Sequence, residues 1–364
     1  MNLIFDAPIN NLSFGNVAIN LLRELYKNKS KVTLFCKTEP DFEAFDRLDP
    51  EFKAWVENSY NYRYHNLDKN LPTLNLWHLN GSEKRISPRQ YLLTFYELDS
   101  PTFVEKKIID LQEKVFLSNP SAVDSFTKLG CDNVHFVPMG FDTDFKVFEN
   151  TSKLVEGKTH FILMGKFEKR KHTKEIIQAW IKKYGNNSKY LLSCCVVNPF
   201  IKHEQMNALL SDVLDGVHYT NVNFLPHLKT NSEVNHLLNS ADIDLTGLSG
   251  AEGWNLPSFN ASALGKWSIV YNHTAHQAWA TPENSILLDA PEKEKAADGL
   301  FFAENGNFNV GNIHGFNEDQ VIAAMEQAET KIEETNTEGL KLQQEFSYKK
   351  SLDTILKHMD TNNG

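Results

Sequence analysis

The first half of the chain alternates short apolar runs with segments of helical period. An apolar run at 2–5 opens the chain, and apolar residues then share one face of a predicted helix at 15–28. Further strand-like runs follow at 31–37, 73–79, 91–96, 114–118 and 134–139. The aromatic, charged stretch from 41 to 71 has no clear period and predicts no element. Strands that alternate with helices of this length predict βαβ units and a parallel sheet.

The alternation lapses into a polar stretch between Phe145 and Lys158 and then starts again. We place a domain boundary there, which gives domains at 1–150 and 151–337. Strand-like runs in the second half stand at 159–165, 190–197 and 267–271, with helical segments at 173–184, 203–214, 231–239 and 257–264. Two such halves predict an α/β protein with two doubly wound, Rossmann-like domains that face each other. Two more helices, 317–334 and 338–359, are expected before a frayed tail.

Composition narrows the class of protein. Hydrophobic residues make up 41% of the 364 residues, enough for two cores, and no apolar run approaches the roughly 18 residues of a membrane span. The first residues lack the basic and apolar regions of a signal peptide. Four cysteines without a CxxC pair are expected to be buried free thiols of a cytoplasmic protein (Cys36, Cys131, Cys194 and Cys195). The net charge of −10 disfavours a nucleic-acid backbone as partner.

A basic segment follows the first strand of the second half. Gly165 ends that strand, a helix begins near 173, and cationic side chains lie between them (Lys166, Lys169, Arg170 and Lys171). Cations beside a helix N-terminus, at the carboxyl end of a parallel strand, predict a binding site for a diphosphate. The alternative is a solvated basic turn, because most charge runs lie on the surface.

An acidic loop follows a later strand of the same half. Ser249 ends the strand, Glu252 stands in the loop, and Pro257 begins a helix. A carboxylate in this position can accept hydrogen bonds from sugar hydroxyls, and Asn260 lies eight residues further on. An ordinary βαβ turn with a surface glutamate is the alternative interpretation.

The strand ends of the first half carry a second group of polar residues. They are predicted to share one edge of the first sheet and to contact an acceptor (His78, Asn80, Tyr96, Glu97 and Asp99). Glu97 is a candidate base or sugar contact. Helix capping by Asp99 or Ser100 ahead of Pro101 is an equally good explanation for those two residues.

Other motifs add little specific chemistry. Gly15 allows a ligand to approach the first helix, but a plain helix start explains it nearly as well, and no GxGxxG motif is present. We interpret two DxD pairs as structural, Asp142 with Asp144 and Asp242 with Asp244. The 13 histidines form no HExxH motif, so we predict a site without metal.

Four segments together resemble the retaining GT-B glycosyltransferases of glycosyltransferase family four. The segments are VHFVPMGFDTDFKVF (134–148), FILMGKFEKRKHTKEIIQAW (161–180), NSADIDLTGLSGAEGWNLPSFNASALGKWSIVYN (239–272) and QEFSYKKSLDTILKHM (344–359). They are similar, in this order, to the family's hinge approach, its G-R-L-x-x-x-K-G loop, its E-x7-E region and its closing F-S-W helix. The resemblance covers about residues 115–360.

The resemblance implies roles for particular residues. It implies that Lys166 and Lys171 hold the donor diphosphate and that Glu252 contacts the donor sugar. It also implies a crossing of the helix at 338–364 back to the first domain. The full donor set that we expect is Gly15, Gly165, Lys166, Arg170, Lys171, Ser249, Glu252, Gly253, Trp254, Asn255, Leu256 and Asn260, with Glu252, Lys171, Lys166 and Glu97 in the catalytic group.

Five positions depart from the family's pattern. Asn260 replaces the second acid of E-x7-E, and Lys166 replaces an arginine and so lacks bidentate geometry. Tyr96-Glu97 stands where the family has His-Asp, and His172 replaces a glycine.

The function that the resemblance implies is retaining, metal-independent transfer of a sugar from a UDP-, GDP- or ADP-sugar to an acceptor hydroxyl. The nucleotide sugar is then a co-substrate, and no further cofactor is expected. The acceptor remains open between a glycan, a lipid, a protein and a modified nucleobase. A catalytically degenerate binding or scaffold subunit is the main alternative, and a nucleotide-sugar epimerase or a phosphorylase is a third.

Overall fold

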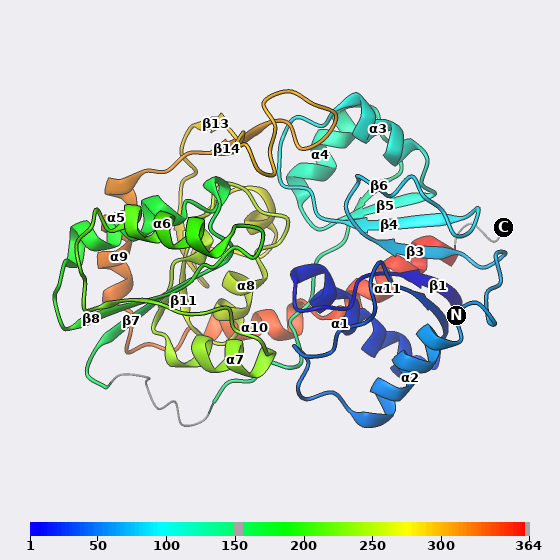
Figure 1. Ribbon diagram of the computed structural model, residues 1–364, viewed down its shortest axis with the longest axis horizontal. Coiled ribbons are helices and arrows are strands. Elements are labelled where there is room, and N and C mark those ends of the chain that lie inside the picture. Colours follow the sequence, from blue (N-terminus) through cyan, green and yellow to red (C-terminus); the bar gives the residue numbers. More distant parts are fainter. Residues whose placement is uncertain (149–155, 361–364) are drawn as a thin grey trace.

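The computed structural model describes residues 1–148 and 156–360, and two parallel six-stranded sheets dominate it (Figure 1). The first sheet has the order β2-β1-β3-β4-β5-β6 and the second the order β12-β11-β10-β7-β8-β9. The strands of the first sheet are β1 (Asn2–Asp6), β2 (Lys31–Phe35), β3 (Thr73–Leu76), β4 (Gln90–Thr94), β5 (Lys114–Leu117) and β6 (Val134–Phe136). Those of the second are β7 (Thr159–Met164), β8 (Tyr190–Cys195), β9 (Val222–Phe224), β10 (Ile243–Asp244), β11 (Trp267–Tyr271) and β12 (Ile286–Leu288). The predicted pair of doubly wound domains is confirmed.

Helices connect these strands as βαβ units. In the first half they are α1 (Ser13–Lys27), α2 (Pro50–Asn61), α3 (Phe103–Asp110) and α4 (Pro120–Lys128). In the second half they are α5 (Thr173–Tyr184), α6 (His203–Val213), α7 (Asn231–Ser240), α8 (Leu256–Ala263) and α9 (Glu318–Glu329). Short 3₁₀ turns stand at Lys169–Lys171, Thr246–Leu248 and Thr274–Ala278. The sequence pattern gave no sign of α2 or of the antiparallel pair β13 (Lys293–Lys295) and β14 (Asn312–His314).

Both sheets are apolar on both faces because helices cover each side. In β4, Leu92 and Leu93 point to different cores, and Phe161 and Ile162 do the same in β7. Leu93 and Ile162 belong to one continuous core that runs from the first sheet into the second. The two domains are therefore joined by packed apolar side chains and not by the connecting segment alone.

The end of the chain returns to the first domain. After α10 (Thr337–Glu345), which packs on α8, the helix α11 (Tyr348–Asp360) lies against α1 and β5 (Figure 1). Leu352, Ile355 and Met359 are its buried face, and the Ser351 hydroxyl donates to the Pro138 carbonyl at 2.6 Å. The crossing helix that the resemblance implied is confirmed. The predicted boundary at 150/151 and the predicted frayed tail at 361–364 lie outside the described residues.

A half-buried arginine ties α1 to the segment that leaves the first sheet. The Arg23 guanidinium lies 2.5 Å from an Asp144 oxygen and 3.4 Å from an Asp142 oxygen. Burial, and then the charge of Asp144, raise the pKa of Asp142 to about 6, although Arg23 opposes them. The second DxD pair bonds to the backbone amides of His160 and Thr246. Both pairs thus serve the fold, as we interpreted them.

We expect Arg23→Ala to lower the free energy of unfolding by about 3 kcal/mol, because it leaves two buried carboxylates without their cation. Urea unfolding measures this loss. The loss should shrink as the pH falls toward about 6, because Asp142 takes up its proton at a higher pH once Arg23 is gone, and it should level off below that value. Lys27→Ala, which breaks an exposed pair with Glu24 on the same helix, is the matched control and should cost less than about 0.5 kcal/mol.

Candidate active site

The carboxyl ends of the two sheets face each other, and loops from both meet there. The Ser118 hydroxyl, just after β5, donates to the Gly253 carbonyl at 2.5 Å. A Cβ on Gly253 would lie 2.8 Å from the Cβ of Phe95, which follows β4. Ligands of parallel α/β sheets bind at such strand ends. Chemistry at this junction can therefore draw on side chains from both domains.

The basic segment after β7 is not a solvated turn. Gly165 takes a φ of +126°, a conformation that suits glycine, and turns the chain away from the strand. The Lys171 side chain packs over Gly165, with its Cε 3.6 Å from a Cβ built there. Arg170 is buried, and His172 adopts a left-handed φ of +50° immediately before α5. The fold therefore turns Arg170 and Lys171 inward, whereas Lys169 stays exposed.

Five charged side chains of alternating sign form a line that we call the charged row (Lys166, Glu168, Arg170, Glu252 and Lys171). The Lys166 ammonium lies 2.9 Å from a Glu168 oxygen, and Arg170 lies 3.3 Å from the other. Arg170 also reaches one Glu252 oxygen at 3.1 Å, and Lys171 reaches the other at 2.5 Å. The basic and acidic loops that the sequence singled out thus form a single cluster.

Burial and charge shape the acidity of this cluster. Burial acts to raise the pKa of Glu252, but Lys171 and Arg170 outweigh it and hold that pKa far below its usual range. Burial lowers the pKa of Lys171. Burial also raises the pKa of Glu97. The charges of Arg170 and Glu252 act on this carboxyl, which therefore belongs to the same site. Glu252 is consequently held as an anion, whereas burial favours the protonated form of Glu97 and raises its pKa.

Hydrogen bonds and aromatic packing hold the acidic loop in place. Asn255 takes a left-handed φ of +65°, and its side-chain amide donates to the Thr246 carbonyl at 3.0 Å and lies 3.0 Å from a ring nitrogen of His276. Burial lowers the pKa of His276 to about 4, so the ring is neutral near pH 7. Trp254 packs edge-on against Phe346 in the core between the sheets. Its side chain therefore fixes the loop, while its main chain stays near Glu252.

The remaining residues of the predicted donor set are buried or half-buried. Ser249 and Asn260 are buried, and the Ser249 hydroxyl and the side-chain amide oxygen of Asn260 have no hydrogen-bond partner among the described residues. Leu256 begins α8 and is half-buried. Gly15 is buried, and a Cβ there would lie 2.1 Å from the Asn10 carbonyl oxygen. The close approach that requires glycine at position 15 is thus made by the preceding loop.

On the acceptor side, the structure brings two of the five predicted residues to the charged row. His78 is exposed, its ring lies 4.6 Å from that of Phe14, and the surrounding protein together with Lys166 lowers its pKa. Glu97 is the second. Asn80 is exposed in the turn after β3.

Tyr96 and Asp99 are engaged elsewhere. Tyr96 is buried, and its hydroxyl donates to Glu105 at 3.1 Å. Thr102 caps α3 and forms a capping box with Glu105, so the suggested capping by Asp99 or Ser100 is wrong. Asp99 turns instead toward the segment that carries β13 and β14, which reaches it from the second domain.

That segment, residues 293–314, which we call the strap, lies across the two domains near α3 (Figure 1). Asp99 accepts from the Asn312 amide and from Lys293, each at 2.9 Å, and the Thr102 hydroxyl donates to the Asn307 carbonyl at 2.6 Å. These hydrogen bonds outweigh burial and lower the pKa of Asp99 to about 2. The polar, asparagine-rich sequence of the strap has no period, so its position was not predictable.

The other side of the strap supports the charged row. The His314 amide donates to the Gly250 carbonyl at 2.8 Å, two residues before Glu252. The Lys166 ammonium lies 4.7 Å from the centre of the Phe301 ring, and the Arg170 guanidinium lies 5.9 Å from that of Phe302. The strap therefore links loops of the first domain to the residues that position Glu252.

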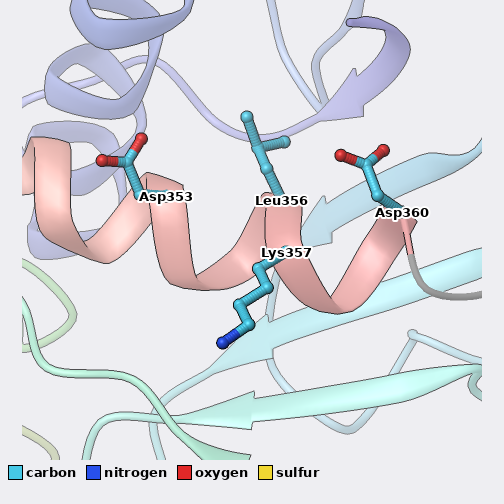
Figure 2. Close-up of a pocket in the computed structure, with 4 residues that line it drawn as sticks. All are labelled: Asp353, Leu356, Lys357 and Asp360. Carbon is cyan, nitrogen blue, oxygen red and sulfur yellow. The ribbon is translucent and has the colours of Figure 1, made fainter.

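Three further observations bear on the function. A shallow depression lies along α11, lined by Asp353, Leu356, Lys357 and Asp360, and it contains no residue of the charged row (Figure 2). Within residues 1–148 and 156–360, no group of three His, Cys, Asp or Glu side chains is placed to hold a metal ion. In the same ranges, no helix is long and apolar enough to cross a membrane. The charged row remains the strongest candidate site.

Comparison with known proteins identifies the fold. No protein-family model matches the chain, and no curated protein matches its sequence. Solved structures do match it. Sucrose-phosphate synthase from Thermosynechococcus elongatus has a TM-score of 0.69 at 11% identity, over 99% of this chain and 98% of that one. HepE from Anabaena, in complex with UDP-glucose, has a TM-score of 0.67 at 13% identity, over 99% and 100%.

A UDP-forming trehalose-phosphate synthase from Burkholderia xenovorans gives a TM-score of 0.67 at 10% identity, over 99% of this chain and 98% of that one. The match extends over nearly the whole chain in all three cases. The chain therefore has the GT-B fold, the two-domain architecture of these glycosyltransferases.

We expect Asp99→Ala to release the strap, because Asn312 and Lys293 both bond to this carboxylate. Hydrogen exchange of the amides between 296 and 312 should then become faster. Ser100→Ala is the control, since Ser100 only donates a hydrogen bond to Asp99 and both strap contacts remain. Equal exchange in Asp99→Ala and the unchanged protein would show that Asp99 does not hold the strap.

Proposed function

We propose that this protein is a glycosyltransferase that moves a sugar from a nucleoside-diphosphate sugar to an acceptor hydroxyl. The observation that carries the proposal is the charged row, where three cations and Glu252 gather at the junction of two parallel sheets. The GT-B fold supports the proposal. Two of the matching structures are a sucrose-phosphate synthase and a UDP-forming trehalose-phosphate synthase, and HepE was solved with UDP-glucose.

Lys171 and Lys166 are the proposed contacts of the donor diphosphate. Both stand between the end of β7 and the start of α5, so the amides of the helix N-terminus add to their positive charge. Negative charge builds on the diphosphate as the bond to the sugar breaks. Fixed cations in a buried site stabilise that charge more strongly than water does.

Glu252 is the proposed contact of the donor sugar. Arg170 and Lys171 keep this buried carboxylate ionised, so that it accepts hydrogen bonds from sugar hydroxyls. The main chain at 253–256 follows directly and lies beside it. Asn260, with its unpaired buried oxygen, and Ser249 are the polar groups that complete the donor side.

The acceptor is proposed to enter from the first domain, where His78 and Glu97 face the charged row. Glu97 is the proposed contact of the reacting hydroxyl. Attack on the face of the leaving diphosphate retains the configuration of the sugar and needs neither a protein nucleophile nor a metal ion. The packed core between the sheets and the strap limit the access of water, which protects the donor from hydrolysis.

The donor and the location are also part of this proposal. UDP-glucose is the first donor to test, because HepE was solved with it, and GDP- and ADP-sugars follow. The acceptor classes stay as the sequence left them: glycan, lipid, protein or modified nucleobase. The four cysteines are free thiols, which fits a reducing compartment such as the cytoplasm.

Thermal unfolding with a panel of nucleoside diphosphates and their sugars tests donor binding, since a ligand of the native state raises the melting temperature. Slow release of glucose from UDP-glucose without acceptor, measured with and without EDTA, then tests for transfer chemistry. A protein that binds UDP but releases no sugar, with any acceptor supplied, would be a binding subunit and would contradict the proposal.

We expect Lys171→Ala to reduce turnover of UDP-glucose by about 100-fold, because it removes one of the cations that stabilise the leaving diphosphate. The rate of UDP release measures this. Lys174→Ala is the matched control, since Lys174 lies in the first turn of α5, three residues after Lys171, but pairs with Asp212 at the surface. Turnover at the original rate in Lys171→Ala would refute the assignment of the diphosphate site.

A further inference from the structure

Each cation of the proposed diphosphate site already has a carboxylate of this chain as partner. Glu252 neutralises Lys171 and one side of Arg170, and Glu168 neutralises Lys166 and the other side of Arg170. Glu168 is nearly inaccessible, with 2% of its side chain exposed. A buried carboxylate next to an anion site repels the anion, so Glu168 opposes the binding that its neighbours favour.

The three cations differ in their freedom to change partner. Arg170 is 7% exposed and is held by both glutamates and by the Ala251 carbonyl at 2.5 Å. Lys171 is 13% exposed and bonds to Glu252 at 2.5 Å. The Lys166 side chain is 36% exposed, and its partner besides Glu168 is a pair of aromatic rings. Lys166 is therefore the cation that can turn toward a ligand without breaking the buried core of the row.

The rings give the Lys166 ammonium a second attractive position. It lies 4.7 Å from the centre of the Phe301 ring and 5.3 Å from that of Phe200. A cation over such rings keeps part of its stabilisation while its hydrogen bonds change. Lys166 can thus leave Glu168 and remain beside the site.

From this geometry we propose that Glu168 is a built-in competitor of the donor diphosphate for Lys166. In the empty site Glu168 holds the ammonium, an arriving diphosphate takes it over, and Glu168 takes it back when the nucleoside diphosphate leaves. Glu168 thereby weakens the affinity for diphosphates and favours product release. This inference rests on the proposed function, because it takes the charged row as the diphosphate site.

A purely structural role for Glu168 makes a different prediction. The Arg170 guanidinium donates to one oxygen of Glu168 at 3.3 Å, and a glutamine oxygen can accept the same hydrogen bond. Glu168→Gln therefore keeps the support of Arg170 and removes the charge that holds Lys166. Damage to the fold weakens binding, whereas loss of a competitor strengthens it.

The test is the dissociation constant of UDP, and of inorganic pyrophosphate, measured by calorimetry on the full chain. We expect Glu168→Gln to bind UDP about fivefold more tightly than the unchanged protein, the effect of one weak ion pair that no longer has to be broken. The matched control is Glu294→Gln. Glu294 pairs with Lys169 of the same loop at 3.4 Å, but in an exposed pair outside the charged row, and its substitution should leave UDP binding unchanged.

Coupling to Lys166 is tested by combining Glu168→Gln with Lys166→Ala. Most of the gain in affinity should disappear in this background, because the lysine that Glu168 captures is absent and only the direct repulsion between Glu168 and the diphosphate remains. Equal or weaker UDP binding by Glu168→Gln with an unchanged melting temperature would overturn the inference, and so would a gain of undiminished size without Lys166. If Glu168→Gln does not fold, Glu168→Asp, which withdraws the carboxylate by one methylene, should bind UDP more tightly by the same argument.

The proposed function fails in a distinguishable way. If Lys171→Ala binds UDP as tightly as the unchanged protein, the diphosphate does not lie on the charged row, and the proposed function and this inference are both wrong. If Lys171→Ala loses UDP binding while Glu168→Gln shows no gain, the site assignment stands and only the inference about Glu168 is overturned.

Discussion

The pairing of Glu252 with Arg170 and Lys171 is the interaction on which the rest of the site depends. A carboxylate that is only 4% exposed, at the junction of two apolar cores, is tolerated because two cations share its charge. Arg170 in turn is buried and forms a second ion pair with Glu168. Glu168 is then paired with Lys166 as well. Each charged side chain in the row thus balances the charge of its neighbour, starting from Glu252 and moving outward to Lys166.

The geometry of the row depends on both domains. Trp254, two residues after Glu252, is locked into the core between the sheets by Phe346, which precedes the helix that returns to the first domain. The strap bonds to Asp99 on one side and to Gly250 on the other. A relative movement of the domains would therefore shift the loop that carries Glu252. Closure of the site would in this way be coupled to the position of the Glu252 carboxylate.

Periodicity was informative where both faces of an element are buried and uninformative elsewhere. The central strands of both sheets were predictable because each is covered on both faces, which forces continuous apolar runs such as 190–197. α2 and the strap escaped prediction because their sequences mix aromatic, charged and asparagine residues. Strand ends located the edge that we propose for the acceptor but not the direction of its side chains, so Tyr96 lies in the core while Glu97 lies within electrostatic range of the charged row.

The sequence by itself determined two βαβ halves, a basic loop after one strand and an acidic loop after another, because these features are written in local spacing. Only the tertiary structure decided how they combine. Lys171 and Glu252 are 81 residues apart, and nothing local states that they touch. Whether a lysine is a free phosphate ligand or the partner of a glutamate depends on which distant segments the fold brings within a few ångströms, and charge at that range outweighs any local preference.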